Sequence, residues 1–396
     1  MFATHPSSAL YGSDRMLLES LAGFVDAGAE VVLTVPGPGP LVGLAEDLGV
    51  EVLVRPVPVL RKSALSLRGG AALAGATVAA AVRGAALLRR LRPDVAYVST
   101  LTTPSWIALA RALRVPVVCH VHEAESTAAP AVQRVLTAPL LAATSVLVNS
   151  TFALEVLERS WPRLRGRSTV VLNGVAGPPT PAGARPRAAG PVHLLYVGRL
   201  SERKGVLVAV EALGRLLGAG LDVRLDLVGD VFAEHEDFGR RLRARLAEPA
   251  LADRVALHGF SADVWGHLAA CDVLLVPSVL PEPFGNTAVE GVLAGRPVVA
   301  SATGGLPEAV GGFASVRLVA AGDAAALADA VRTLVGDLPA VSAAALSDAG
   351  AAATRYAPGR YRADVAGQVL AVARRAARPA VREPAPGRAR SVTGSG

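Results

Sequence analysis

Two carboxylates flank a glycine-containing turn in residues 277–295, which read PSVLPEPFGNTAVEGVLAG. Glu282 precedes the turn at Gly285, and Glu290 lies about one turn into a helix that we expect over residues 287–293. A glycine lets the backbone approach a ligand closely, and the free N–H groups of a helix start favour an anion. The two acids can accept hydrogen bonds from hydroxyl groups. The pattern therefore suits a nucleotide diphosphate that carries hydroxyls at both ends.

A second group of charges begins at Gly198, where an apolar, strand-like run over residues 192–197 ends. Arg199 and Lys204 flank the polar turn that follows, and a segment with helical periodicity comes next. Two cations beside a helix N-terminus can hold a diphosphate. Lys204 is also one of only two lysines in a chain that otherwise uses arginine. A solvated charged turn is the alternative interpretation.

A third candidate follows the predicted strand at residues 115–119, in the sequence His120-Val121-His122-Glu123. Two histidines two residues apart on an extended segment point to the same side. A metal site needs more ligands than these two side chains provide. The alternatives are a core histidine, or a ligand contact just past the carboxyl end of a parallel strand, where open α/β sheets bind their ligands. We favour the ligand contact for His122 and take His120 as the second choice.

Taken together, these segments resemble the family-4 retaining glycosyltransferases, which have the GT-B fold. Glu282 and Glu290 have the E-x7-E spacing of that family, inside the frame PS-x-x-x-EPFG-x-x-x-x-E. The segment from Gly198 matches its G-R-x-x-x-x-K-G motif, and residues 116–123 match P-V-V-x-x-V-H-[DE]. Residues 304–308 match G-G-x-x-E, a turn that the family places beside the phosphates and the donor sugar.

The resemblance implies metal-independent transfer of a sugar from a nucleotide-diphosphate sugar to an acceptor, with retention of anomeric configuration. It implies that Glu282 holds donor-sugar hydroxyls, that Glu290 holds the ribose, and that His122 reaches the donor sugar. Arg199 and Lys204 would stabilise the departing diphosphate. The expected donor contacts are Gly12, Gly198, Arg199, Lys204, Gly259, Phe260, Glu282, Phe284, Gly285, Asn286, Thr287 and Glu290. It implies no metal and no further cofactor, and it leaves the sugar, the base and the acceptor open.

A chain of 396 residues is too long for one ordinary core, so we expect two domains. The resemblance makes them Rossmann-like α/β domains with a cleft between them: an acceptor-side domain at 1–176, a linker at 177–190 and a nucleotide-sugar domain at 191–357. The linker is the clearest compositional break, because it is rich in proline. A helix at 358–376 would cross back to the first domain, and the tail at 377–396 is expected to be disordered.

The net charge of +7 could suit nucleic acid or an anionic membrane surface. We find no nucleic-acid motif and expect no nucleic-acid partner.

Cys119 and Cys271 adjoin apolar runs and are expected to be buried thiols. Residues 70–88 are apolar but interrupted by Arg83, which favours a core helix over a membrane span. We expect a cytoplasmic protein that acts on a glycan, a glycolipid or other lipid-linked acceptor, or a small molecule, with room for a peripheral contact at the inner face of the membrane.

Two further features limit the interpretation. The glycines between Gly37 and Gly43 have the spacing G-x-G-x-x-x-G with interposed prolines, so we expect a loop there and not a dinucleotide fingerprint.

Other functions on the same architecture also stay open, namely a sugar-nucleotide epimerase or hydrolase and a non-catalytic nucleotide-sugar-binding protein. Consumption of the donor without an acceptor, or an epimerised product, would separate these from a transferase.

Overall fold

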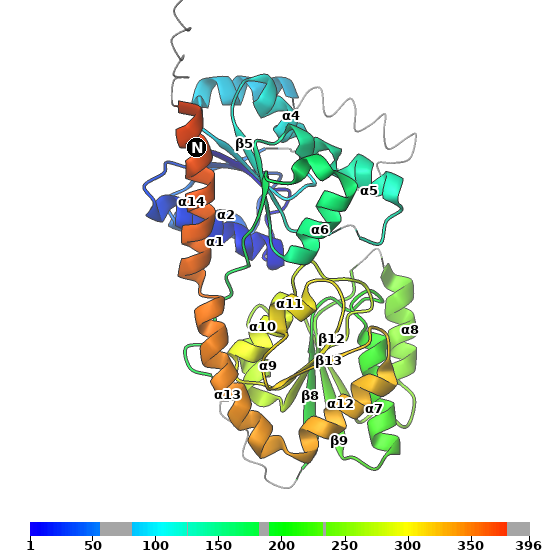
Figure 1. Cartoon of the computed structure of the whole chain (residues 1–396). Helices are drawn as coiled ribbons and strands as arrows, with labels where there is room; N and C mark the ends of the chain where they lie inside the picture. The colour runs from blue at the N-terminus through cyan, green and yellow to red at the C-terminus, as the bar shows by residue number, and fades with distance from the viewer. Residues whose placement is uncertain (56–80, 125, 182–189, 233–234, 378–396) are drawn as a thin grey trace, which may run out of the picture.

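Two parallel β-sheets, each flanked by helices, make up the computed structural model of this chain (Figure 1). The structure describes residues 1–55, 81–124, 126–181, 190–232 and 235–377. The first sheet has seven strands in the order β3-β2-β1-β4-β5-β6-β7. Their bounds are Phe2–Thr4 (β1), Val32–Val35 (β2), Glu51–Val54 (β3), Ala96–Ser99 (β4), Val117–Val121 (β5), Ser145–Val148 (β6) and Ser168–Val170 (β7). Helices α1 (Gly12–Asp26), α2 (Pro40–Asp47), α4 (Pro104–Ala112), α5 (Pro130–Thr137) and α6 (Thr151–Ser160), together with a helix over residues 81–91, connect them.

The second sheet has six strands in the order β10-β9-β8-β11-β12-β13. Their bounds are Val192–Val197 (β8), Val223–Val228 (β9), Val255–Gly259 (β10), Val273–Val276 (β11), Val298–Ser301 (β12) and Val316–Val319 (β13). Its helices are α7 (Val206–Gly218), α8 (Glu236–Leu246), α9 (Trp265–Ala270), α10 (Asn286–Leu293), α11 (Leu306–Val310), α12 (Ala324–Gly336) and α13 (Leu338–Arg355). We call the two sheets with their helices the first and the second unit.

The central strands are buried on both faces, which explains their continuous apolar sequences. All four residues of β11 and of β12 are buried, and so are those of β4. Parallel strands read this way because their crossover helices cover both faces of the sheet. In each sheet the chain winds outward in one direction and then in the other, with the reversal between β1 and β4 and between β8 and β11. Ligands of open α/β sheets bind at such switch points.

The last helix, α14 (Pro358–Ala377), leaves the second unit and packs on α1 of the first, as predicted (Figure 1). The Tyr361 hydroxyl lies 2.8 Å from the Ser20 hydroxyl of α1, and Arg362 donates a hydrogen bond of 2.7 Å to Glu19. Gly23 allows this approach, because a Cβ there would lie 2.6 Å from the carbonyl oxygen of Arg362. The two-unit α/β fold and the returning helix are therefore confirmed.

Several local expectations need correction. The loop predicted over Gly37–Gly43 is only partly a loop, because α2 begins at Pro40, where the fixed φ of proline suits the first helical turn. Helix α13 was not predicted. Of the apolar segment 70–88, residues 81–88 are helical and residues 70–80 lie outside the described part, as do most of the linker and the tail. No described helix is long and apolar enough to cross a membrane.

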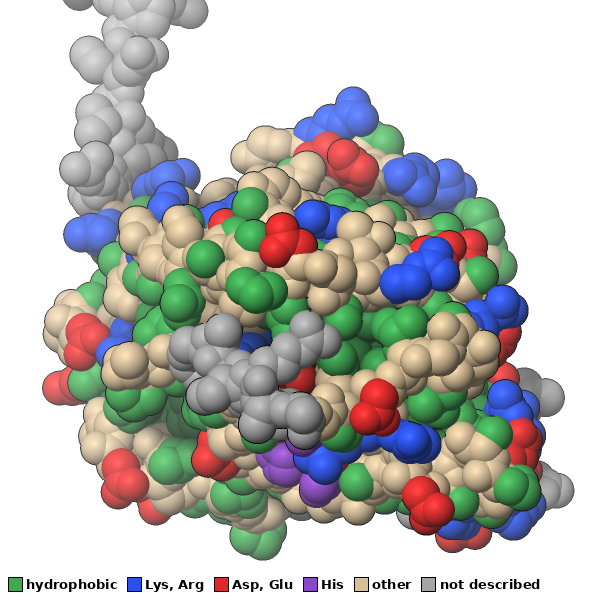
Figure 2. Space-filling model, turned by 90° about the horizontal axis from the view of Figure 1, so that it is seen from below, with side chains coloured by type: hydrophobic (Ala, Val, Ile, Leu, Met, Phe, Trp, Pro, Cys, Tyr) green, Lys and Arg blue, Asp and Glu red, His purple; other side chains and the backbone are tan. Residues whose placement is uncertain are grey.

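The charges are well mixed on the face of the molecule seen from below. Figure 2 shows acidic and basic side chains interspersed with apolar ones there. Cys119 and Cys271 are both buried free thiols, as expected.

Candidate active site

Three loops of the second unit meet around Glu282. They follow β8, β11 and β12, which are neighbours in the sheet, so their carboxyl ends lie at one edge. Glu282 forms a parallel bridge with Gly304, and its carbonyl accepts a hydrogen bond of 2.7 Å from the Gly305 N–H. The Arg203 carbonyl accepts a hydrogen bond of 2.9 Å from the Val279 N–H. The G-R-x-x-x-x-K-G, E-x7-E and G-G-x-x-E segments are thus joined through their backbones at the switch point.

Two glycines with left-handed backbone make this convergence sterically feasible. Gly205 has φ +72° and starts α7; a Cβ there would lie 1.9 Å from the Pro277 carbonyl oxygen. Gly285 has φ +118° and starts α10; a Cβ there would lie 2.5 Å from the Leu306 side chain. Both helices therefore begin in close contact with a neighbouring segment of the second unit.

We expect Gly285→Ala to destabilise the second unit by about 1–3 kcal/mol, since it combines a left-handed backbone with a steric overlap. The melting temperature would fall by roughly 2–10 °C, as measured by differential scanning calorimetry. Gly214→Ala is the matched control, because α7 has open space at that position. An unchanged melting temperature in Gly285→Ala would show that the turn is not constrained as described.

Glu282 is a buried carboxylate held by a cation and a hydroxyl. It is 6% exposed, the Lys204 Nζ lies 2.8 Å from its carboxylate, and the Ser278 hydroxyl donates to it at 2.7 Å. Burial alone would raise the pKa of Glu282, but the charge of Lys204 and the hydrogen bonds from Lys204 and Ser278 outweigh burial and lower it. The carboxylate is therefore ionised at neutral pH. Its contribution to stability is lost only as the pH falls through that lowered pKa.

Glu290 has a different environment, although it is only eight residues away. Burial raises the pKa of Glu290, and the charges of Arg15 and Lys204 only partly offset this. Within the described residues its carboxylate makes no hydrogen bond or ion pair. Arg15 belongs to α1 of the first unit, so the pKa of Glu290 is influenced by charges from both units. A partly buried acid without a protein partner is suited to bind ligand hydroxyls.

Arg199 follows β8 at the same edge of the sheet, close to the buried Tyr196. Arg199 and Glu282 both act electrostatically on Tyr196, whose hydroxyl donates a hydrogen bond of 2.7 Å to the Arg199 carbonyl. The guanidinium carbon of Arg199 lies 3.7 Å from the centre of the Phe232 ring. The charged residues 199, 204, 282 and 290 are therefore brought into one region.

Phe232 belongs to an aromatic group that bridges the two units. The ring of Tyr11, just before α1, lies 5.6 Å from the ring of Phe232 and 6.2 Å from that of Phe260. Phe260 is 56% exposed, and its N–H donates to the Asp230 carboxylate at 3.1 Å. This leaves the predicted Phe260 accessible to a ligand. The predicted Phe284 differs, because it is buried in the core against Tyr356, so only its backbone can face a donor.

Four further contacts close the units on each other. A Cβ on Gly12 would lie 3.6 Å from the Asn286 amide nitrogen, and Asn286 accepts a hydrogen bond of 2.8 Å from Asn173. The Ser150 hydroxyl donates to the Pro283 carbonyl at 2.5 Å. The Glu308 carboxylate accepts hydrogen bonds from the Thr151 N–H at 2.7 Å and from its hydroxyl at 2.9 Å. Glu308, from the G-G-x-x-E segment, thus binds the start of α6 in the first unit.

His120 belongs to β5 and His122 follows it; their ring centres lie 4.2 Å apart, with the ring planes tilted by 33°. The Tyr97 hydroxyl lies 2.7 Å from His120 Nδ1, and burial lowers the pKa of His120 to about 3. Burial and the neighbouring histidines lower the pKa of His122 well below its usual range, so both rings are neutral. The Nε2 atoms of both rings are buried without a hydrogen-bond partner among the described residues. His120 is anchored in the core, while a donor contact of His122 stays a prediction.

On the first unit's side of this site, the sequence interpretation named Gly12 and His122 but missed three other residues. Arg15, Tyr11 and Thr151 contribute to it, and none belongs to a motif that the sequence displays. From the sequence alone, these positions near the starts of α1 and α6 could equally well be exposed to solvent. Packing of the two units places Tyr11 beside Phe232 and Thr151 beside Glu308. It also brings Arg15 to Ala262, whose carbonyl accepts a hydrogen bond of 2.9 Å from Arg15.

Comparisons with known proteins agree with this geometry. Residues 11–176 match the family described as Glycosyltransferase Family 4, and residues 191–337 match Glycosyl transferases group 1. A 2-deoxystreptamine glucosyltransferase of Streptomyces kanamyceticus is 39% identical over 154 residues, which are 38% of each chain. A glycogen synthase of Mycobacterium tuberculosis is 33% identical over 260 residues, 63% of this chain and 62% of that protein. The chain thus aligns with less than two thirds of either relative.

A solved structure shows the same fold. Anabaena HepE, in complex with UDP-glucose, has a TM-score of 0.78 at 22% identity, covering 93% of this chain and 99% of that one. The two parallel α/β sheets and the helix that returns to the first unit have the GT-B fold. The chain belongs to glycosyltransferase family 4, a family of retaining enzymes.

Proposed function

We propose that this protein transfers a hexose from a nucleotide-diphosphate hexose to a hydroxyl of a glycan or lipid-linked acceptor, with retention of configuration. The observation that carries the proposal is the contrast between Glu282 and Glu290. One acid, Glu282, is fixed in an ion pair beside a helix start. The other, Glu290, is partly buried about one helical turn further on and has no partner among the described residues. That contrast fits a ligand that spans the turn.

The residues divide the work as follows in this proposal. The first N–H groups of α10 and the ammonium of Lys204 hold the diphosphate and stabilise the charge that it gains as the bond to the sugar breaks. Lys204 carries three N–H donors, so its contact with Glu282 leaves capacity for a phosphate oxygen. Glu282 binds sugar hydroxyls and Glu290 binds the ribose. Neutral His122 offers one ring nitrogen to the sugar.

A donor panel tests the proposal directly. UDP-, GDP- and ADP-hexoses are added to the full-length chain, and the shift in melting temperature ranks them, because a ligand that binds only the folded state stabilises it. Mass spectrometry of candidate acceptors with the best donor then follows. A sugar added to an acceptor supports the transferase. Free sugar without an acceptor, or an epimerised donor, would assign a hydrolase or an epimerase to the same site.

The raised pKa of Glu290 predicts how donor affinity depends on pH. As the pH falls through that raised pKa, Glu290 becomes protonated and loses its strength as an acceptor for ribose hydroxyls. As the pH is lowered, donor affinity should therefore begin to fall at a higher pH than it would if Glu290 had the usual pKa of glutamate. Isothermal titration calorimetry measures this. Glu290→Gln should bind about tenfold more weakly at neutral pH and lose this pH dependence. The same pH profile in the variant would exclude Glu290 as its source.

A further inference from the structure

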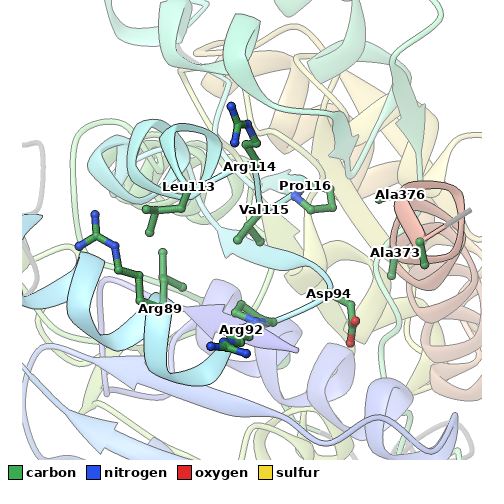
Figure 3. A pocket seen from close by; sticks show the side chains of 12 residues that line it. Arg89, Arg92, Asp94, Leu113, Arg114, Val115, Pro116, Ala373 and Ala376 are labelled. Carbon is green, nitrogen blue, oxygen red and sulfur yellow. The ribbon is translucent and has the colours of Figure 1, made fainter. Parts of the chain in front are cut away.

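A second pocket lies at the opposite edge of the first sheet from the candidate active site. It has a volume of about 580 Å³ and lies where β4 and β5 begin, beside the last turn of α14 (Figure 3). The donor loops lie at the carboxyl ends of the strands, so this pocket is separate from them. Its size is within the range of roughly 300–1,000 Å³ that is typical of small-molecule sites.

Arginines surround this pocket. Arg89, Arg92 and Arg114 stand around it, and Asp94 is the one carboxylate among its lining residues (Figure 3). All three arginines are exposed, and within the described part of the chain their side chains make no ion pair or hydrogen bond. Leu113 and Val115 supply apolar surface between them. The lining is therefore cationic with an apolar interior.

The backbone at two of these arginines is unusual. Arg92 has φ +43° and Arg114 has φ +60°, and each follows the end of a helix that leads into a strand. Four other helices, α1, α2, α7 and α10, end in the same way, and each has glycine in the left-handed position: Gly28, Gly49, Gly220 and Gly295. A left-handed backbone conformation is strained for arginine but not for glycine. A strained backbone beside a pocket points to a function of the side chain.

We propose that this pocket binds a phosphate-bearing anion with an apolar part. Arg92 and Arg114 bind the phosphate through their guanidinium groups, which match its geometry. Leu113 and Val115 contact the apolar part. A soluble phosphorylated compound and a phospholipid headgroup both present this chemistry, and the test distinguishes them.

The test uses the full-length chain with two probes. Hexyl phosphate is titrated by calorimetry, with hexanol as the uncharged control, and vesicles of phosphatidylglycerol are compared with vesicles of phosphatidylcholine by co-sedimentation. The double variant R92G/R114G removes both guanidiniums and relieves the backbone strain, so its melting temperature should stay the same or rise. The matched control is R90A/R111A, which removes two exposed arginines from the same two helices outside the pocket.

We expect R92G/R114G to lose affinity for the bound probe by about tenfold or more, while R90A/R111A keeps it. Binding of hexyl phosphate assigns a soluble ligand, and binding of phosphatidylglycerol vesicles alone assigns a headgroup. The proposal is overturned if neither probe binds or if both double variants lose binding equally. Donor-induced thermal shifts should be unchanged in R92G/R114G, which separates this result from the proposed transferase activity.

Discussion

Replacing Lys204 by alanine is expected to lower turnover by about 10²-fold or more while the chain stays folded. Lys204 is the cation of the site that acts on both acids, since it pairs with Glu282 at 2.8 Å and its charge reaches Glu290. Its loss would leave the departing diphosphate without this charge. The measurement is kcat and KM with the donor found in the panel, together with the melting temperature.

The Lys204→Ala experiment has a matched control and a clear contradiction. Arg215→Ala removes a cation from α7, the helix that follows Lys204, where Arg215 pairs with Glu211 on the surface, and it should leave turnover unchanged. The double variant Lys204→Ala/Glu282→Gln separates charge balance from catalysis. It should recover stability, because no buried charge is left unpaired, but it should not recover turnover. Near-normal turnover in Lys204→Ala would contradict the phosphate role.

Glu282→Gln is expected to have the second-largest effect, a loss of about 10²-fold in kcat/KM. The amide keeps the shape of the side chain but removes the negative charge that holds Lys204 and accepts from Ser278. Sugar hydroxyls would lose a charged acceptor. Steady-state kinetics with the donor varied measures the effect.

The comparison for Glu282 is Glu211→Gln on the exposed face of α7, which should behave like the unaltered chain. If Glu282→Gln kept normal kcat/KM, the buried carboxylate would be a structural group and not a ligand for the donor sugar. A change of melting temperature without a kinetic change would likewise show that the Glu282 carboxylate has a structural role. A loss in kcat/KM with little change in melting temperature supports the proposed role.

The sequence predicted the central strands and the local parts of the site well. Strand β8 was expected at residues 192–197 and occurs there, because a buried parallel strand reads as a largely apolar run. The loops with Arg199, Lys204 and Glu282 lie together because each follows a strand of one parallel sheet. Their relation could therefore be inferred from motif positions before any coordinates.

Other parts could not be predicted for physical reasons. Helix α13 is so rich in alanine that its buried and exposed faces differ little in hydropathy, and no periodicity marks it. The contacts of Tyr11, Arg15 and Thr151 depend on how the two units meet, which no local pattern encodes. The boundaries proposed for the two domains and the donor role of His122 stay predictions.

A crystal structure of the chain with its best nucleotide sugar tests the central claim most directly. The account predicts the diphosphate between Lys204 and the first N–H groups of α10, with the ribose on Glu290 and the sugar beside Glu282. A nucleotide bound elsewhere, or one that leaves Glu282 and Glu290 without contacts, would contradict it.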